Sequence, residues 1–225
     1  MNPWLQLDRA DVPGGGDELR LMQRGADFSI MLGREELMNS RLSGSEEALA
    51  TLSCARLRDR QRPRILIGGL GMGFTLRAAL RDLGPEARVV VAELVPAVVA
   101  WAKGPLAGLF AGSLDDRRVT IREGDVGALM RADRTRYDAI LLDVDNGPEG
   151  LTRDANDALY SLAGLAAARA ALHPGGLLSV WSSGPAPRFT ERLRRSGFAV
   201  EEARVRARDV GKGARHVIWI AVRGG

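Results

Sequence analysis

The sequence predicts an α/β protein built as a three-layer sandwich, with a mostly parallel sheet between two layers of helices. Two observations lead to this prediction. From residue 64 onward, short and nearly continuous apolar runs alternate with helical segments, and the last two strand candidates are joined by a short glycine-containing loop at 211–213. Continuous apolar runs are typical of strands covered on both faces, and a βα alternation produces a parallel sheet with right-handed crossovers.

The first 60 residues are expected to precede this sandwich as a separate small part, and residues 61–225 to form the α/β domain itself. Residues 1–24 are mixed in character and are predicted to be an irregular lead-in. Residues 28–38 alternate around Gly33, which predicts a small β-hairpin with the glycine at its turn. A serine-rich stretch followed by Glu46 and Glu47 predicts a serine-capped helix over about 45–60, with acids suited to its positive end.

The α/β part is predicted element by element from its apolar pattern. The strand candidates are 64–67, 88–92, 118–121, 138–143 and 176–181, and the helix candidates between them are 73–83, 95–103, 126–132 and 154–172. A helix at 187–196 then precedes two further strands, 199–205 and 216–222, which should pair antiparallel at one sheet edge. A Rossmann-like sheet closed by an antiparallel C-terminal hairpin is the architecture of nucleotide-dependent methyltransferases and their relatives.

A glycine-rich stretch lies where the first of these strands turns into the first helix. Its glycines are Gly68, Gly69, Gly71 and Gly73, with Leu70 among them. Glycine suits such a loop because the turn needs unusual φ values and a ligand must approach the backbone closely. The spacing G-x-G-x-G fits an adenosylmethionine-type loop better than the G-x-G-x-x-G of NAD sites, whose third glycine would fall on Phe74 or Leu76.

Acidic residues follow the next three strands. Glu93 ends the second strand and is followed by Leu94, Asp125 follows the third and precedes Val126, and Asp143 ends the fourth. An acid in the position of Glu93 can accept hydrogen bonds from both ribose hydroxyls, and Asp125 could meet an adenine amino group. Each acid alone could be a solvated loop residue, but together with the glycines they predict a nucleotide site.

Composition argues against nucleic-acid binding, membrane contact and metal binding. The net charge of +4 and pI near 9.9 suggest nucleic acid, but the arginines are interleaved with acids on helix faces, so a nucleic-acid partner is disfavoured. We find no apolar run of about 18 residues and no signal pattern, so a cytoplasmic protein without membrane contact is expected. One cysteine and two separated histidines give no metal-ligand pattern, and no metal is expected.

Several motifs, taken in order, resemble those of the spermidine synthases, the polyamine aminopropyltransferases. They are ILIGGLGMG, VVVAELVP, REGDV, YDAILLDVDNGPEG and ALHPGGLLSVWSS. The resemblance covers roughly residues 28–183, including the predicted hairpin. It implies that decarboxylated S-adenosylmethionine donates an aminopropyl group to a small-molecule amine by an SN2 displacement, without a metal. It also implies a homodimer as one form of assembly.

The resemblance also implies roles for individual residues. Gly69 and Gly71 would face the methionine-derived part of the nucleotide, Glu93 the ribose, and Asp125 with Val126 the adenine. Asp143 lies where the family has its catalytic aspartate, and Asp145 and Glu149 would line an acidic amine pocket. Asn39 resembles a glutamine that reaches the nucleotide in the family.

The chain departs from the family on the acceptor side. The family's loop D-x-x-D-P-x-G-P is two residues shorter here, from Asp143 to Pro148, and the family's D-E-x-x-Y-H-E corresponds to 45–51, which contains no Tyr or His. Glu46 and Glu47 remain there, where they suit a first helical turn equally well. An adenosylmethionine-dependent methyltransferase and a non-catalytic nucleotide-binding relative therefore stay open. The first basic residue after the glycines is Arg77, one helical turn further on, which favours the decarboxylated nucleotide.

Overall fold

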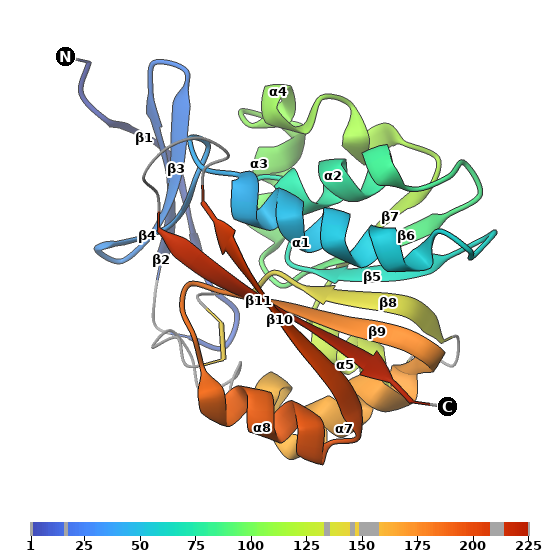
Figure 1. The fold of residues 1–225 in the computed structure, drawn as a ribbon. Helices are drawn as coiled ribbons and strands as arrows, with labels where there is room; N and C mark the ends of the chain where they lie inside the picture. Colours follow the sequence, from blue (N-terminus) through green and yellow to red (C-terminus); the bar gives the residue numbers. More distant parts are fainter. Residues whose placement is uncertain are drawn as a thin grey trace.

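The chain folds around two sheets, shown in Figure 1. The computed structural model describes residues 2–15, 18–132, 136–144, 147–148, 158–207 and 214–224. One sheet has the strand order β1-β2-β3-β4, and the other has the order β10-β11-β9-β8-β5-β6-β7. The predicted α/β class with a mostly parallel central sheet is confirmed.

The N-terminal sheet is antiparallel throughout. Its strands are β1 (Leu5–Asp11), β2 (Glu18–Arg24), β3 (Asp27–Leu32) and β4 (Glu35–Asn39). The predicted hairpin is present as β3 and β4, but the prediction of an irregular lead-in is wrong, because residues before it form β1 and β2. Strand β1 lies at the edge of the sheet, and its apolar residues Leu5 and Leu7 are 60% and 41% exposed. It therefore lacks the buried apolar face by which a strand is usually predicted.

The central sheet has the strands expected from the apolar runs. They are β5 (Arg64–Gly68), β6 (Arg88–Glu93), β7 (Val119–Glu123), β8 (Tyr137–Leu142), β9 (Leu172–Ser182), β10 (Phe198–Arg206) and β11 (Arg215–Arg223). The strands from β9 through β8, β5 and β6 to β7 pair in parallel, and β11 and β10 complete one edge antiparallel. The predicted C-terminal hairpin is therefore confirmed; its loop at 211–213 lies outside the described residues.

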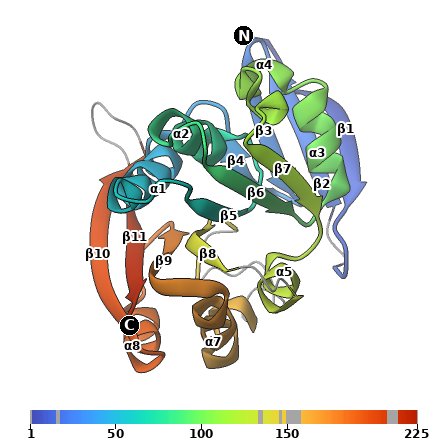
Figure 2. The same cartoon turned by 90° about the vertical axis from the view of Figure 1, so that its right-hand side faces the viewer.

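Helices cover both faces of the central sheet, as Figure 2 shows, with α1 and α2 on one side and α5, α7 and α8 on the other. Their bounds are α1 (Gly44–Cys54), α2 (Phe74–Asp82), α3 (Pro96–Lys103), α4 (Ala107–Phe110), α5 (Val126–Ala132), α7 (Leu162–Ala171) and α8 (Pro187–Arg195), with 3-10 turns at Ala55–Leu57 and Ser113–Asp115. Part of the helix predicted at 154–172 lies outside the described residues. Among the described residues no helix is long and apolar enough to cross a membrane.

The start of α1 differs from its prediction. Ser43 occupies the N-cap position but makes no side-chain capping bond. The fully buried Ser45 instead donates its hydroxyl to Glu46 Oε2 at 2.6 Å. The helix itself is confirmed, but its serine side-chain cap was predicted wrongly, because the Ser45 hydroxyl binds a carboxylate and the Ser43 side chain makes no capping bond to a backbone amide.

The N-terminal sheet packs across the carboxyl ends of the parallel strands. Leu21 and Ile30 are fully buried in the same apolar core as Ile65 and Ile67, and burial of each such side chain contributes about 1.5–3 kcal/mol. The Trp101 indole of α3 also donates a 2.6 Å hydrogen bond to Asp8 in β1. The sheet is thereby fixed over the strand ends where a doubly wound fold binds its ligand.

Candidate functional site

The glycine loop between β5 and α2 has the strained backbone that its composition predicts. Gly69 has φ +93° and Gly71 has φ +49°, in the left-handed region that favours glycine. A Cβ on Gly69 would lie 2.3 Å from the backbone oxygen of Asp143, whereas one on Gly71 would lie 3.2 Å from the Met38 sulfur. Gly69 is thus required by the close approach of the end of β8, and Gly71 keeps the loop open beneath Met38.

Glu93, at the end of β6, braces this loop. Its side chain is buried, and its two carboxylate oxygens accept 2.9 Å hydrogen bonds from the backbone amides of Leu70 and Val95. Burial raises the pKa of Glu93, and the amide bonds act in the opposite direction. The backbone amides of Gly71 and Leu94 also act on this carboxylate, which lines the adjacent cavity.

A cavity of about 120 Å³, here called the larger hollow, lies between the N-terminal sheet and the carboxyl ends of β5, β6 and β8. Apolar side chains of the N-terminal sheet, such as Leu19 and Ile30, form part of its wall. The predicted site residues that line it are Gly69, Gly71, Glu93, Leu94, Asp125, Val126 and Asp143. Gly68 lies outside it, packed close to Val126 and Leu142.

Asp125 sits on the rim of the larger hollow and also has a structural task. Its Oδ1 accepts a 2.6 Å hydrogen bond from the backbone amide of Ala128, in the first turn of α5, and lies 3.7 Å from the Arg131 guanidinium. The side chain is about half exposed. Its contact with an adenine therefore stays a prediction.

A second cavity, here called the smaller hollow, adjoins the first. Its lining includes Gly73 and Trp181, and it shares Leu37, Met38, Gly71 and Asp143 with the larger hollow. The smaller hollow contains two carboxylates, Asp143 and Glu46, and no Lys or Arg of the described residues lines it. Asp143 thus stands at the junction of the two cavities.

Glu46 is the site residue that sequence reasoning missed. In the sequence it is explained as an acid in the first turn of a helix. The packing of α1 against α2 and β9 brings it to the same cavity as Asp143. The only signal in the sequence was its survival in the stretch that aligns with an acidic family motif.

Asp143 has a pKa close to physiological pH. Burial raises its pKa to about 7, the nearby Glu46 charge adds to the rise, and a 2.5 Å hydrogen bond from the Thr75 hydroxyl acts in the opposite direction. Burial likewise raises the pKa of Glu46, against the effect of its bond from Ser45. A carboxyl group with such a pKa can exchange a proton with a bound ligand at physiological pH.

The Glu46 carboxylate is held from behind by a short polar chain. The Ser45 hydroxyl, which donates to Glu46, lies 2.8 Å from Nδ1 of His216 on β11. With the serine hydrogen committed to Glu46, Nδ1 of a neutral imidazole must carry its hydrogen and donate to the serine oxygen. The imidazole also packs edge-on against Trp181, with ring centres 4.9 Å apart, so the wall of the smaller hollow is supported on two sides.

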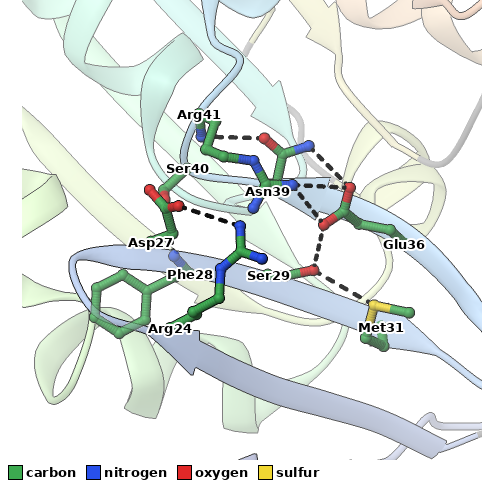
Figure 3. Close-up of polar contacts among 9 residues, drawn as sticks. All are labelled: Arg24, Asp27, Phe28, Ser29, Met31, Glu36, Asn39, Ser40 and Arg41. Carbon is green, nitrogen blue, oxygen red and sulfur yellow. Dashed lines mark hydrogen bonds and ion pairs between the residues drawn. The ribbon is translucent and has the colours of Figure 1, made fainter. Parts of the chain in front are cut away.

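Asn39 does not join the site. Figure 3 shows its amide beside Glu36 and Arg41: Nδ2 donates to Glu36 Oε2 at 3.2 Å, and Oδ1 accepts from the Arg41 backbone amide at 3.0 Å. It lines neither hollow, so its placement gives no support to the predicted nucleotide contact. Asp145 and Glu149, predicted to line the amine pocket, lie outside the described residues.

Comparison with known proteins points to one family, although no family model matches the chain. A polyamine aminopropyltransferase of Mycobacterium tuberculosis is 34% identical over 152 residues, which cover 63% of this chain and 28% of that protein. Polyamine aminopropyltransferase 1 of Streptomyces coelicolor is 33% identical over 150 residues, covering 63% and 27%. The chain therefore matches less than a third of the length of these curated relatives.

The fold agrees with this sequence similarity. The spermidine synthase of Thermotoga maritima superimposes with a TM-score of 0.76 at 18% identity, over 97% of this chain and 73% of that one. Because the superposition includes nearly all of the chain, it extends to the N-terminal sheet as well as the α/β part. In sequence the chain is thus similar to the polyamine aminopropyltransferases, and in fold it is similar to a spermidine synthase.

Proposed function

We propose that the chain binds decarboxylated S-adenosylmethionine in the larger hollow and transfers its aminopropyl group to a small amine in the smaller hollow. The observation that carries the proposal is the position of Asp143, which lines both hollows and has a second acid, Glu46, beside it on the smaller side. An acidic cavity is suited to an amine, because carboxylates hold ammonium groups and one of them can take a proton.

The nucleotide end of the proposal rests on the larger hollow. Glu93 is buried, is held by backbone amides that include those of Leu70 and Val95, and lines the cavity, as a ribose-binding carboxylate would. Leu94 and Val126 provide apolar surface for a base. The glycine backbone at Gly71 lies on the boundary with the smaller hollow, where the sulfonium part of the nucleotide would pass.

Charge favours the decarboxylated nucleotide. Among the described residues, neither hollow is lined by Lys or Arg, and Arg77 donates to the backbone oxygen of Leu109 at 2.8 Å instead. The carboxylate of adenosylmethionine would meet Asp143 and Glu46 without a neutralising cation. The decarboxylated form offers only an ammonium at that end, so its binding is stabilised by the same acids.

The chemistry assigned to the chain is positioning and proton transfer. The sulfonium nucleotide supplies an electrophilic carbon and a neutral leaving group. Asp143, when ionised, accepts the proton that the attacking amine must lose before its lone pair can form the new carbon–nitrogen bond, while the carbon–sulfur electrons remain with sulfur. Glu46 holds positive charge in the smaller hollow.

Calorimetric titration with decarboxylated S-adenosylmethionine, S-adenosylmethionine and methylthioadenosine tests the proposal. We expect the decarboxylated form to bind more tightly than the other two, and Glu46→Gln to reduce that preference. Glu47→Gln is the matched control, because Glu47 pairs with Arg81 and lines neither hollow. A preference for S-adenosylmethionine would instead favour methyl transfer, and binding of none of the three would remove the nucleotide site.

A further inference from the structure

A second candidate site lies at the amino-terminal end of β8, opposite to the carboxyl end at which Asp143 lies. Arg136 immediately precedes β8 and Asp143 immediately follows it, so the two positions are about 20 Å apart along the strand. Here a shallow cavity opens between the C-terminal ends of α7 and α8 and the end of β11. We call it the arginine hollow; its polar lining residues are Arg136, Arg169, Arg195, Ser196 and Arg223.

The four guanidinium groups of the arginine hollow share no acidic partner within the described part of the chain. Arginines elsewhere, such as Arg41 and Arg118, pair with carboxylates at 3.0 and 2.8 Å. Among the described residues no such ion pair forms at the arginine hollow, and none of those that line it is acidic. Burial lowers the pKa of Arg223, and the charges of Arg136 and Arg169 lower it further. These positive charges therefore repel one another, and no carboxylate of the described residues compensates them.

Hydrogen-bond donors at the same place are also left unused. Arg169 Nε, Arg223 Nε and Ser196 Oγ are buried and have no hydrogen-bond partner among the described residues. Buried polar atoms in native proteins are nearly always paired, so three at one cavity need an explanation. These three atoms are enclosed, so a ligand in the hollow would contact the exposed Arg136 and Arg195 side chains beside them and offset the positive charge of the cluster.

Helix ends explain only part of the cluster. The Arg223 guanidinium donates through Nη1 to the backbone oxygens of Arg169, at 2.7 Å, and Leu172, and so caps the end of α7. The partial negative charge of a helix C-terminus amounts to about half an elementary charge. The ends of α7 and α8 together therefore balance only about one of the four positive charges.

We propose that the arginine hollow binds a multivalent phosphate-type oxyanion, free or as part of a small phosphorylated molecule. The guanidinium group suits this chemistry because its planar fork can donate two parallel hydrogen bonds to one phosphate. The site is separate from the larger and smaller hollows and does not depend on the function proposed for them.

Calorimetric titration with inorganic phosphate, pyrophosphate and ribose 5-phosphate, at ionic strength matched with sodium chloride, tests this site. We expect saturable binding that weakens at least tenfold in the double variant Arg136→Ala/Arg195→Ala. Arg194→Ala is the matched control, since Arg194 is an exposed neighbour on α8 that does not line the hollow. Tightest binding of ribose 5-phosphate would identify a phosphate ester as the ligand source, and tightest binding of pyrophosphate a free anion.

Two results would overturn the proposal. One is no saturable binding of any of the three anions to the unmodified chain, or equal binding by the double variant. The other concerns the protein without added anion: removing two uncompensated charges should leave the melting temperature unchanged or raise it. A lower melting temperature of the double variant would mean that these arginines stabilise the fold instead of serving a ligand.

Discussion

The Thr75 hydroxyl donates a 2.5 Å hydrogen bond to Oδ2 of Asp143 and so joins the first turn of α2 to the end of β8. The same hydroxyl lies 3.2 Å from the backbone oxygen of Glu46. Its single hydrogen serves one acceptor at a time. When Asp143 is ionised the hydroxyl donates to it; when Asp143 is protonated the acid can donate and the hydroxyl can turn to Glu46. Both protonation states of Asp143 are thus accommodated without moving the backbone.

Replacing Thr75 by valine should raise the pKa of Asp143. The hydrogen bond stabilises the ionised form, and its loss, worth about 0.5–1.5 kcal/mol, corresponds to a shift of up to about one pH unit. We expect the rising limb of kcat/KM against pH for aminopropyl transfer to move to higher pH by that amount. Thr51→Val, at an exposed position on α1, is the control, and a shift to lower pH would contradict the assignment.

Replacing Glu46 by glutamine should move the rising limb of kcat/KM against pH to lower pH. The Glu46 charge helps to raise the pKa of Asp143, so its removal makes the ionised form of Asp143 easier to reach. The KM for the amine should rise in the same variant, because one of the two carboxylates of the smaller hollow is lost. Glu47→Gln should change neither quantity, and an unmoved profile in Glu46→Gln would show that the two acids do not interact.

Asp143→Asn should abolish transfer while nucleotide binding survives. An amide cannot accept the amine proton, and loss of general-base catalysis typically lowers rates 10²–10⁴-fold. The substitution is nearly isosteric, so the larger hollow should keep its shape. Single-turnover assays and calorimetry on the same preparation separate the two effects. Turnover equal to that of the unmodified chain would remove the proton-transfer role.

The sequence predicts the nucleotide half of the site better than the acceptor half. Gly69, Gly71 and Glu93 belong to strand ends, and parallel strands bring their carboxyl ends to one edge whatever the details of packing. Glu46 could not be placed in this way, because its position depends on how α1 packs against α2, far away in the sequence. Trp181 is a similar case, because a buried residue that lines a cavity has the same sequence pattern as one in the core.

Asp143 should also make the fold less stable as pH rises. Its pKa is about 7 in the folded chain and near 3.9 when unfolded, so the folded state binds more protons between these values and its stability falls with rising pH. Between pH 5.5 and 8 this amounts to about 2 kcal/mol, because one pH unit below the folded pKa is worth about 1.4 kcal/mol and the effect ends once Asp143 is ionised. Asp143→Asn should lose that part of the slope in urea unfolding at pH 5.5 and 8. Identical slopes for both proteins would mean that Asp143 is ionised throughout.

Gly71→Ala tests whether Gly71 is needed for ligand binding or only for the conformation of the turn. Gly71 has φ +49°, and an alanine in the left-handed region costs about 1–2 kcal/mol. The new methyl group would lie 3.2 Å from the sulfur of Met38, a flexible side chain that can move aside. We therefore expect a folded protein with a slightly lower melting temperature.

The same methyl group would project where the two hollows meet, so nucleotide affinity in Gly71→Ala should fall at least tenfold. Gly84→Ala is the matched control, because a Cβ there meets no atom within 4 Å and its φ is not positive. Calorimetry with methylthioadenosine is the direct measurement, since this probe carries no aminopropyl group to be transferred. Unchanged affinity in Gly71→Ala, together with a lowered melting temperature, would assign the glycine to the turn alone and move the nucleotide away from this loop.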